Sequence, residues 1–188
     1  MKIIIVNRNI EHQLSHDIPR VDIIPDSAII RDGKPFFVPN FSSRWKYEAM
    51  VAFRSMRLGK NIAPKFAHRY YDAFTLAVRT IPCDLSPSQS AISHAFDGAF
   101  IIGEWIDIEK LNTLNEIKIN IGKKETTIKN SQLDIDNTIA RLSKYFTMKI
   151  GDIICPAILN ISDNININTT ISGAINNITD ECLKLKFK

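Results

Sequence analysis

The sequence has no long hydrophobic run. The apolar stretch near its N-terminus covers only Ile3 to Val6, far short of the roughly 20 apolar residues that a membrane-spanning helix needs. No small-residue cleavage site follows this stretch, so we do not expect a secretory signal. The sequence therefore predicts a chain that has no membrane partner.

Cysteine and excess charge are also scarce. The three cysteines in 188 residues, Cys83, Cys155 and Cys182, are too few and too widely spaced for a disulfide framework or a zinc site. Free thiols of this kind predict a cytoplasmic protein. The 24 Lys and Arg residues exceed the 20 Asp and Glu residues by only four. We therefore do not expect nucleic acid as a partner.

What the sequence does have is apolar patterning typical of strands. Short apolar or alternating runs predict strands at residues 2–6, 46–53, 99–108, 116–122, 126–130, 151–159 and 164–175. The dipeptide Asp32-Gly33 between two apolar runs predicts a hairpin over residues 28–39. The chain length suits one domain, so we expect a single α+β domain over residues 1–188, mainly of mixed β-sheet.

Two stretches carry a helical pattern. Residues 63–74 have Pro64 in the first turn and apolar residues at i, i+4 and i+7, and residues 133–146 have an apolar stripe. Residues 74–78 fit either the end of the first helix or a strand. Residues 12–27 and 86–90 contain prolines and polar residues without periodicity, which predicts loops.

The predicted strand at residues 46–53 carries one acidic residue, Glu48. Alternation places Glu48 on the same face as Met50 and Ala52. If this face points inward, Glu48 needs a positively charged partner, because burying an isolated charge is very costly.

Five segments, taken in order, resemble the fumarylacetoacetate hydrolase family. They are "DSAIIRDGKPFFVPNFSS", "YEAMV", "RLGKNIAPKFAHRYYDA", "HAFDGAFIIG" and "KYFTMKIGDII". The resemblance is strongest to short bacterial members described as 2-hydroxyhepta-2,4-diene-1,7-dioate isomerases, and it covers residues 25–155. It implies a mixed β-sandwich roll with two or more helices, like the C-terminal domain of that family, assembled as a homodimer. It also implies a divalent cation, Mg²⁺ or Mn²⁺, that polarises small oxo-acids for hydrolysis, isomerisation or decarboxylation.

The residues at the implied metal-binding positions depart from the family pattern. The resemblance places Glu48 at the first carboxylate ligand, Met50 at the second and Arg79 at the third. A thioether is a poor ligand for Mg²⁺, and Arg79 brings a positive charge to a cation site. Only Glu48 is retained. We expect no cofactor, or Mg²⁺ or Mn²⁺ if the family site still functions.

Other implied site positions are altered as well. His94 stands where the family has a lysine, and it could act as a general base or simply fill space. Ala157 and Ile158 replace a Gly-Thr pair that binds substrate carboxylate in the family. His12 and His16 are four residues apart, a metal-like spacing only in a helix, and the nearby prolines predict a loop.

The sequence leaves three functions open. The chain could be a non-catalytic descendant with a structural or subunit-binding role, or an active metal-dependent enzyme acting on small oxo- or β-diketo acids. It could also be a metal-free module that binds a small organic anion through Arg79 and His94. The sharpest hypothesis is that Arg79 pairs with Glu48 in place of the metal. The alternative is an outward-pointing Arg79 with a solvated Glu48.

Overall fold

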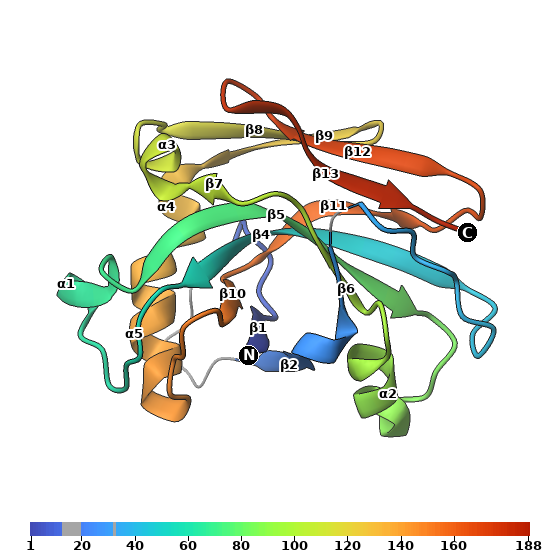
Figure 1. Cartoon of the computed structure of the whole chain (residues 1–188), viewed down its shortest axis with the longest axis horizontal. Helices are drawn as coiled ribbons and strands as arrows, with labels where there is room; N and C mark the ends of the chain where they lie inside the picture. The colour runs from blue at the N-terminus through green and yellow to red at the C-terminus, as the bar shows by residue number, and fades with distance from the viewer. Residues whose placement is uncertain (13–19, 32) are drawn as a thin grey trace.

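The computed structural model of the chain describes residues 1–12, 20–31 and 33–188 and contains two curled sheets (Figure 1). The larger sheet has the strand order β2-β1-β10-β4-β5-β6-β3, with β11 also paired to β4 and β7 to β5. The smaller sheet has the order β13-β12-β8-β9 and lies above β4 and β5 in Figure 1. Apolar side chains from both sheets fill the space between them.

The strands are β1 (Lys2–Val6), β2 (Val21–Pro25), β3 (Ile29–Ile30), β4 (Trp45–Ser55), β5 (Tyr71–Pro82), β6 (Phe100–Ile102), β7 (Ile106–Asp107), β8 (Glu116–Ile121), β9 (Lys124–Lys129), β10 (Ile153–Cys155), β11 (Ile158–Asn164), β12 (Thr170–Ile175) and β13 (Thr179–Lys186). The helices are α1 (Pro64–Ala67), α2 (Ser90–Ala95), α3 (Ile108–Asn112), α4 (Asn130–Leu133) and α5 (Ile135–Tyr145), with short 3-10 turns at Asp26–Ala28 and Pro87–Gln89.

The predicted α+β class is confirmed, with mixed sheet and helices. The strand expected at residues 46–53 is part of β4, and its faces alternate as predicted. Tyr47, Ala49 and Val51 face the core between the sheets. Met50 and Ala52 face the other way, into a second apolar cluster with β1, β6 and β10. The helix expected over residues 133–146 corresponds to α5, whose apolar stripe is buried.

The larger sheet folds back on itself. β1 pairs in parallel with β10 and antiparallel with β2, and β10 pairs with β4. In Figure 1, β1 and β2 lie beneath β4 and β5. This curl brings residues at the ends of β1 and β2 under the middle of the sheet.

The prediction of a helix over residues 63–74 is wrong for most of that range. Only the single turn α1 forms, and β5 begins at Tyr71. Phe66, the first of the apolar residues in the i, i+4, i+7 pattern, is 43% exposed. Residues 74–78, which fitted either a helix or a strand, lie within β5. The long pairing of β5 with β4 overrides the local helical pattern.

Three other local predictions also need correction. Among the described residues of 28–39 the hairpin is not formed, since β3 pairs in parallel with β6 and Phe36 forms an isolated bridge with Phe187, directly after β13. Gly33 does take a positive φ, whereas Asp32 lies outside the described residues. The loop expected at residues 12–27 contains β2, and residues 86–90 enter α2 through a 3-10 turn. Within the described ranges, no helix is both long and apolar enough to cross a membrane.

Candidate functional site

Glu48 and Arg79 are directly opposite each other on the neighbouring strands β4 and β5. Side chains at such cross-strand positions lie within contact distance on one face of the sheet. Arg79 donates from Nε to Glu48 Oε2 at 2.9 Å and from Nη2 to the same oxygen at 2.7 Å. The predicted contact is therefore present, although both donors share one carboxylate oxygen.

The other side of the Arg79 guanidinium contacts residues at the ends of β1 and β2. Nη1 donates to Asp22 Oδ2 at 2.8 Å and to Asn7 Oδ1 at 3.2 Å. Asn7 in turn donates from Nδ2 to Asp22 Oδ2 at 2.8 Å. Arg79 is only 8% exposed. Its Nε, Nη1 and Nη2 all donate hydrogen bonds to protein groups, so most of its five N–H donors are satisfied inside the protein.

A second cation completes the cluster. Lys46, two residues before Glu48 on the same strand, donates from Nζ to Glu48 Oε1 at 2.9 Å. Both oxygens of Glu48 are thus engaged by positive groups. The cluster pairs two carboxylates, Glu48 and Asp22, with two cations, Arg79 and Lys46. We refer to these four residues and Asn7 as the Arg79 cluster.

The cluster keeps Glu48 ionised. Burial raises the pKa of Glu48, but the positive charges and hydrogen bonds of Arg79 and Lys46 outweigh burial, and the net pKa lies below its ordinary value. Nearby, burial raises the pKa of the Cys155 thiol, with a smaller opposing effect from Arg79. A neutral, fully buried thiol is a packing residue.

This ionisation predicts a pH dependence of folding. Because the folded pKa of Glu48 is depressed, its contribution to stability is present above the unfolded value near 4.5 and is lost as pH falls through the folded pKa. The free energy of unfolding of the wild type, measured with urea, should therefore fall more steeply below about pH 4.5 than that of Glu48→Gln. The two free energies of unfolding should converge in acid. Parallel curves would contradict this.

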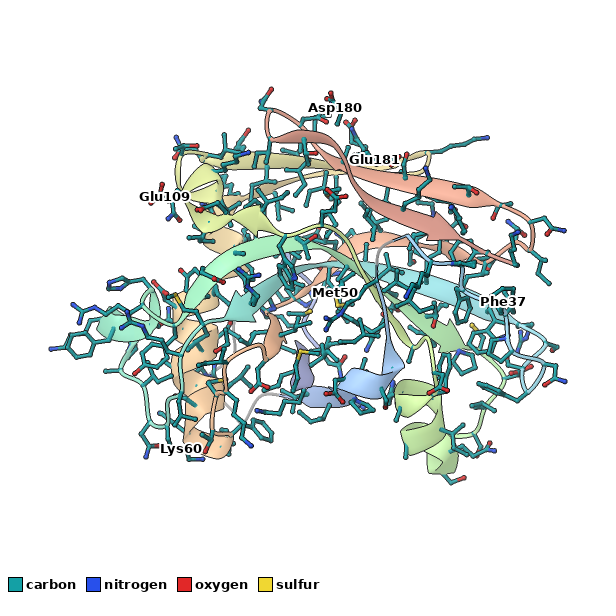
Figure 2. The ribbon with its side chains drawn as sticks, viewed as in Figure 1. Phe37, Met50, Lys60, Glu109, Asp180 and Glu181 are labelled. Atoms are coloured by element: carbon teal, nitrogen blue, oxygen red, sulfur yellow. The ribbon has the colours of Figure 1, made fainter. Side chains whose placement is uncertain are left out.

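The residues at the implied metal positions do not fit Mg²⁺ or Mn²⁺. The oxygens of Glu48 already bind Arg79 and Lys46, Met50 is a fully buried thioether, and hard cations need several converging oxygens. Figure 2 shows Met50 in the middle of the molecule, below β4. Across the part of the chain that the structure describes, no group of three or more His, Cys, Asp and Glu residues is placed to hold a metal.

The other residues at implied site positions do not belong to the Arg79 cluster. His94 lies on α2 with Nε2 3.8 Å from Asp22 Oδ1, too far for a direct hydrogen bond. Ile158 pairs with Met50 across β11 and β4, and its N–H donates to the Arg8 carbonyl at 2.7 Å. Ala157 is buried. His12 is exposed, and His16 lies outside the described residues.

Sequence reasoning missed Asp22, Asn7 and Lys46. Lys46 could have been found, since it shares a face of the predicted strand with Glu48. Asp22 lay in a segment predicted to be a loop, and the strand that carries it is brought to Arg79 only by the curl of the sheet. No local pattern points to that contact.

Comparison with known proteins gives both a family match and structural relatives. A family model described as fumarylacetoacetate (FAA) hydrolase, C-terminal, matches residues 5–156. Among solved structures, fumarylpyruvate hydrolase from Pseudomonas aeruginosa, in complex with Mn²⁺ and pyruvate, is similar at TM-score 0.83 and 15% identity. That match covers 100% of this chain and 89% of the other. The comparison with curated proteins gave no match.

Two further structures have a similar fold. The 5-carboxymethyl-2-hydroxymuconate delta-isomerase from Mycobacterium smegmatis matches at TM-score 0.79 and 19% identity, over 99% of this chain and 78% of that one. Maleylpyruvate hydrolase from a Sphingobium species matches at TM-score 0.80 and 16% identity, over 100% of this chain and 71% of that one. At these identities the likeness shows the fold, which does not carry an activity with it.

Proposed function

This chain belongs to the fumarylacetoacetate hydrolase family, and we propose that it is a non-catalytic member with a structural or subunit-binding role. In this proposal the metal-dependent chemistry of the family has been lost while the fold has been kept. The homodimer implied by the family resemblance belongs to the same proposal.

The observation that carries the proposal is the ion pairing of Arg79. Its guanidinium binds Glu48 and Asp22 at 2.7–2.9 Å, so the negative charge that would attract a dication is already neutralised. A cation placed about 4 Å from Arg79 would also be repelled by about 4 kcal/mol for each pair of unit charges near a protein surface. Metal binding would therefore require Arg79 to leave a buried position.

Binding of a small organic anion at this site is less well supported. Arg79 is the positive group that such a ligand would use, but two carboxylates and an amide oxygen already accept its hydrogen bonds. An incoming carboxylate would have to displace Glu48 or Asp22. Each of these would then lose a charge-assisted bond while still largely buried.

Thermal melts with ligands test the proposal. We expect no change in Tm when Mg²⁺, Mn²⁺ or a panel of small oxo-acids is added, alone or together. A functional site filled at 100 times its Kd would add about 2.7 kcal/mol to the free energy of unfolding. Stabilisation that requires a metal would restore the enzyme hypothesis, and stabilisation by acids alone would favour anion binding.

A further inference from the structure

The positive charge of the chain is concentrated at one end of the molecule. Residues 55–71 and 137–151 together contain seven of the 24 Lys and Arg residues and no Asp or Glu, leaving 17 basic against 20 acidic residues elsewhere. The two segments are adjacent, because the Asn61 N–H donates to the Ser143 carbonyl at 3.0 Å. We call these two segments the basic end. Its α1 and α5 lie at the left of Figure 1.

The basic end also presents aliphatic side chains to solvent. Residues 55–59 and 148–152 run side by side, joined by backbone hydrogen bonds between Gly59 and Met148 and between Gly151 and Ser55. Between these hydrogen-bonded residues, Leu58 is 68% exposed and Ile150 is 73% exposed. Two of the most exposed large apolar side chains in the described chain therefore project from adjoining segments.

The same two segments carry exposed cations. Six of the basic residues are exposed, namely Arg57, Lys60, Lys65, Arg69, Lys144 and Lys149. None of the six forms an ion pair with any residue of the ranges 1–12, 20–31 and 33–188.

The basic end also carries an exposed aromatic ring. Phe66 on α1 has Lys65 Nζ at 4.9 Å and Arg69 Cζ at 5.1 Å from its ring centroid. The ring is 43% exposed, and Tyr145 at the end of α5 is 50% exposed. Aromatic side chains flanked by cations suit a boundary between a polar and an apolar phase.

From these observations we propose that the basic end is a docking surface for an anionic lipid bilayer. Lys and Arg would attract the acidic headgroups, each by about 1 kcal/mol near the surface, while Leu58, Ile150 and Phe66 enter the boundary between headgroups and acyl chains. Binding of this kind is peripheral and reversible. It departs from the sequence-based prediction of no membrane partner, which rested on the absence of a spanning segment and of a secretory signal.

Other occupants suit the surface less well. A second copy of the chain docked through the same end would bring like charges together. A nucleic acid would match the charge, but it offers the aliphatic tips Leu58 and Ile150 no apolar phase, since its affinity comes mainly from phosphate contacts. The combination of unpaired cations and exposed aliphatic side chains is what favours lipid.

Vesicle sedimentation of the full chain tests the proposal. The protein should bind vesicles of phosphatidylcholine mixed with phosphatidylserine, should not bind phosphatidylcholine alone, and should be released by high salt. Lys65→Gln combined with Lys149→Gln should weaken binding about 30-fold, at about 1 kcal/mol for each charge. Leu58→Ser combined with Ile150→Ser should also weaken it while leaving the salt dependence in place.

Matched controls lie elsewhere on the surface. Lys34→Gln with Lys123→Gln removes the same charge, and Phe37→Ser removes an apolar side chain as exposed as Leu58, at 68%. Figure 2 shows Phe37 on the side of the molecule opposite Lys60. These variants should bind like the wild type, and all variants should keep the wild-type Tm. The proposal fails if anionic vesicles are not bound, if the controls lose as much binding, or if only heparin or RNA is bound.

Discussion

Arg79→Met should lower the free energy of unfolding by about 3–5 kcal/mol, because it leaves Glu48 and Asp22 largely buried without their shared cation. Their side chains are only 16% and 18% exposed, so water cannot fully replace the guanidinium. Lys46 would still hold one oxygen of Glu48, whereas Asp22 would keep its hydrogen bond from the Asn7 amide and the more distant His94, 3.8 Å away. Urea unfolding at neutral pH measures the loss.

A matched control lies on the same two strands. Arg54 of β4 pairs with Asp72 of β5 through two hydrogen bonds of 2.8–2.9 Å, but both side chains are more than a third exposed. Arg54→Met should therefore cost only about 1 kcal/mol or less from the lost pair. Similar losses in the two variants would show that burial of the Arg79 cluster has no special energetic role.

Removing the two carboxylates that Arg79→Met leaves unpaired should recover part of the lost free energy of unfolding. When Arg79→Met is combined with Glu48→Gln and Asp22→Asn, the cluster no longer contains a carboxylate, and a neutral replacement of a buried ion pair is often close to the stability of the original. We expect the triple variant to be more stable than Arg79→Met alone at pH 7. The two should become similar in acid, where the carboxylates of the single variant are protonated.

The contact between Glu48 and Arg79 could be predicted because its causes are local to two strands. Alternation fixed the face of Glu48, and the cost of an unpaired buried carboxylate required a cation nearby. The family resemblance supplied the position of Arg79. Asp22 could not be predicted, because it reaches the guanidinium only through pairings that join β2 to β1, β1 to β10 and β10 to β4.

The predicted helix over residues 63–74 failed for a related reason. Its apolar spacing satisfies a helical period, and Pro64 does begin one turn of helix. From Tyr71 onward, however, the sequence also fits the two-residue period of a strand. Eleven residue pairs join β4 to β5. A short periodic pattern cannot tell these alternatives apart, since the partner strand lies about 20 residues earlier in the chain.

A second large effect is expected when the carboxylates are restored. Met50→Glu with Arg79→Asp would place two new acids beside Glu48 on one face of β4 and β5, with Asp22 close by. Without a cation these charges repel one another, so the double variant should be much less stable than the wild type. Hard divalent cations bind sites of this composition, in which several carboxylate oxygens converge.

Mn²⁺ should therefore rescue the double variant and leave the wild type unchanged. At 100 times its Kd the ion would add about 2.7 kcal/mol, equivalent to a rise in Tm of about 5–10 °C for a chain of this size. Met50→Gln with Arg79→Asn is the control, since it has nearly the same shape but adds no negative charge and should not respond. If the double variant does not fold without metal, refolding with and without Mn²⁺ provides the same comparison. Equal behaviour of the double variant and its amide control would mean that Met50 and Arg79 do not stand at former metal-binding positions, and the proposed loss of the metal site would then lack its basis.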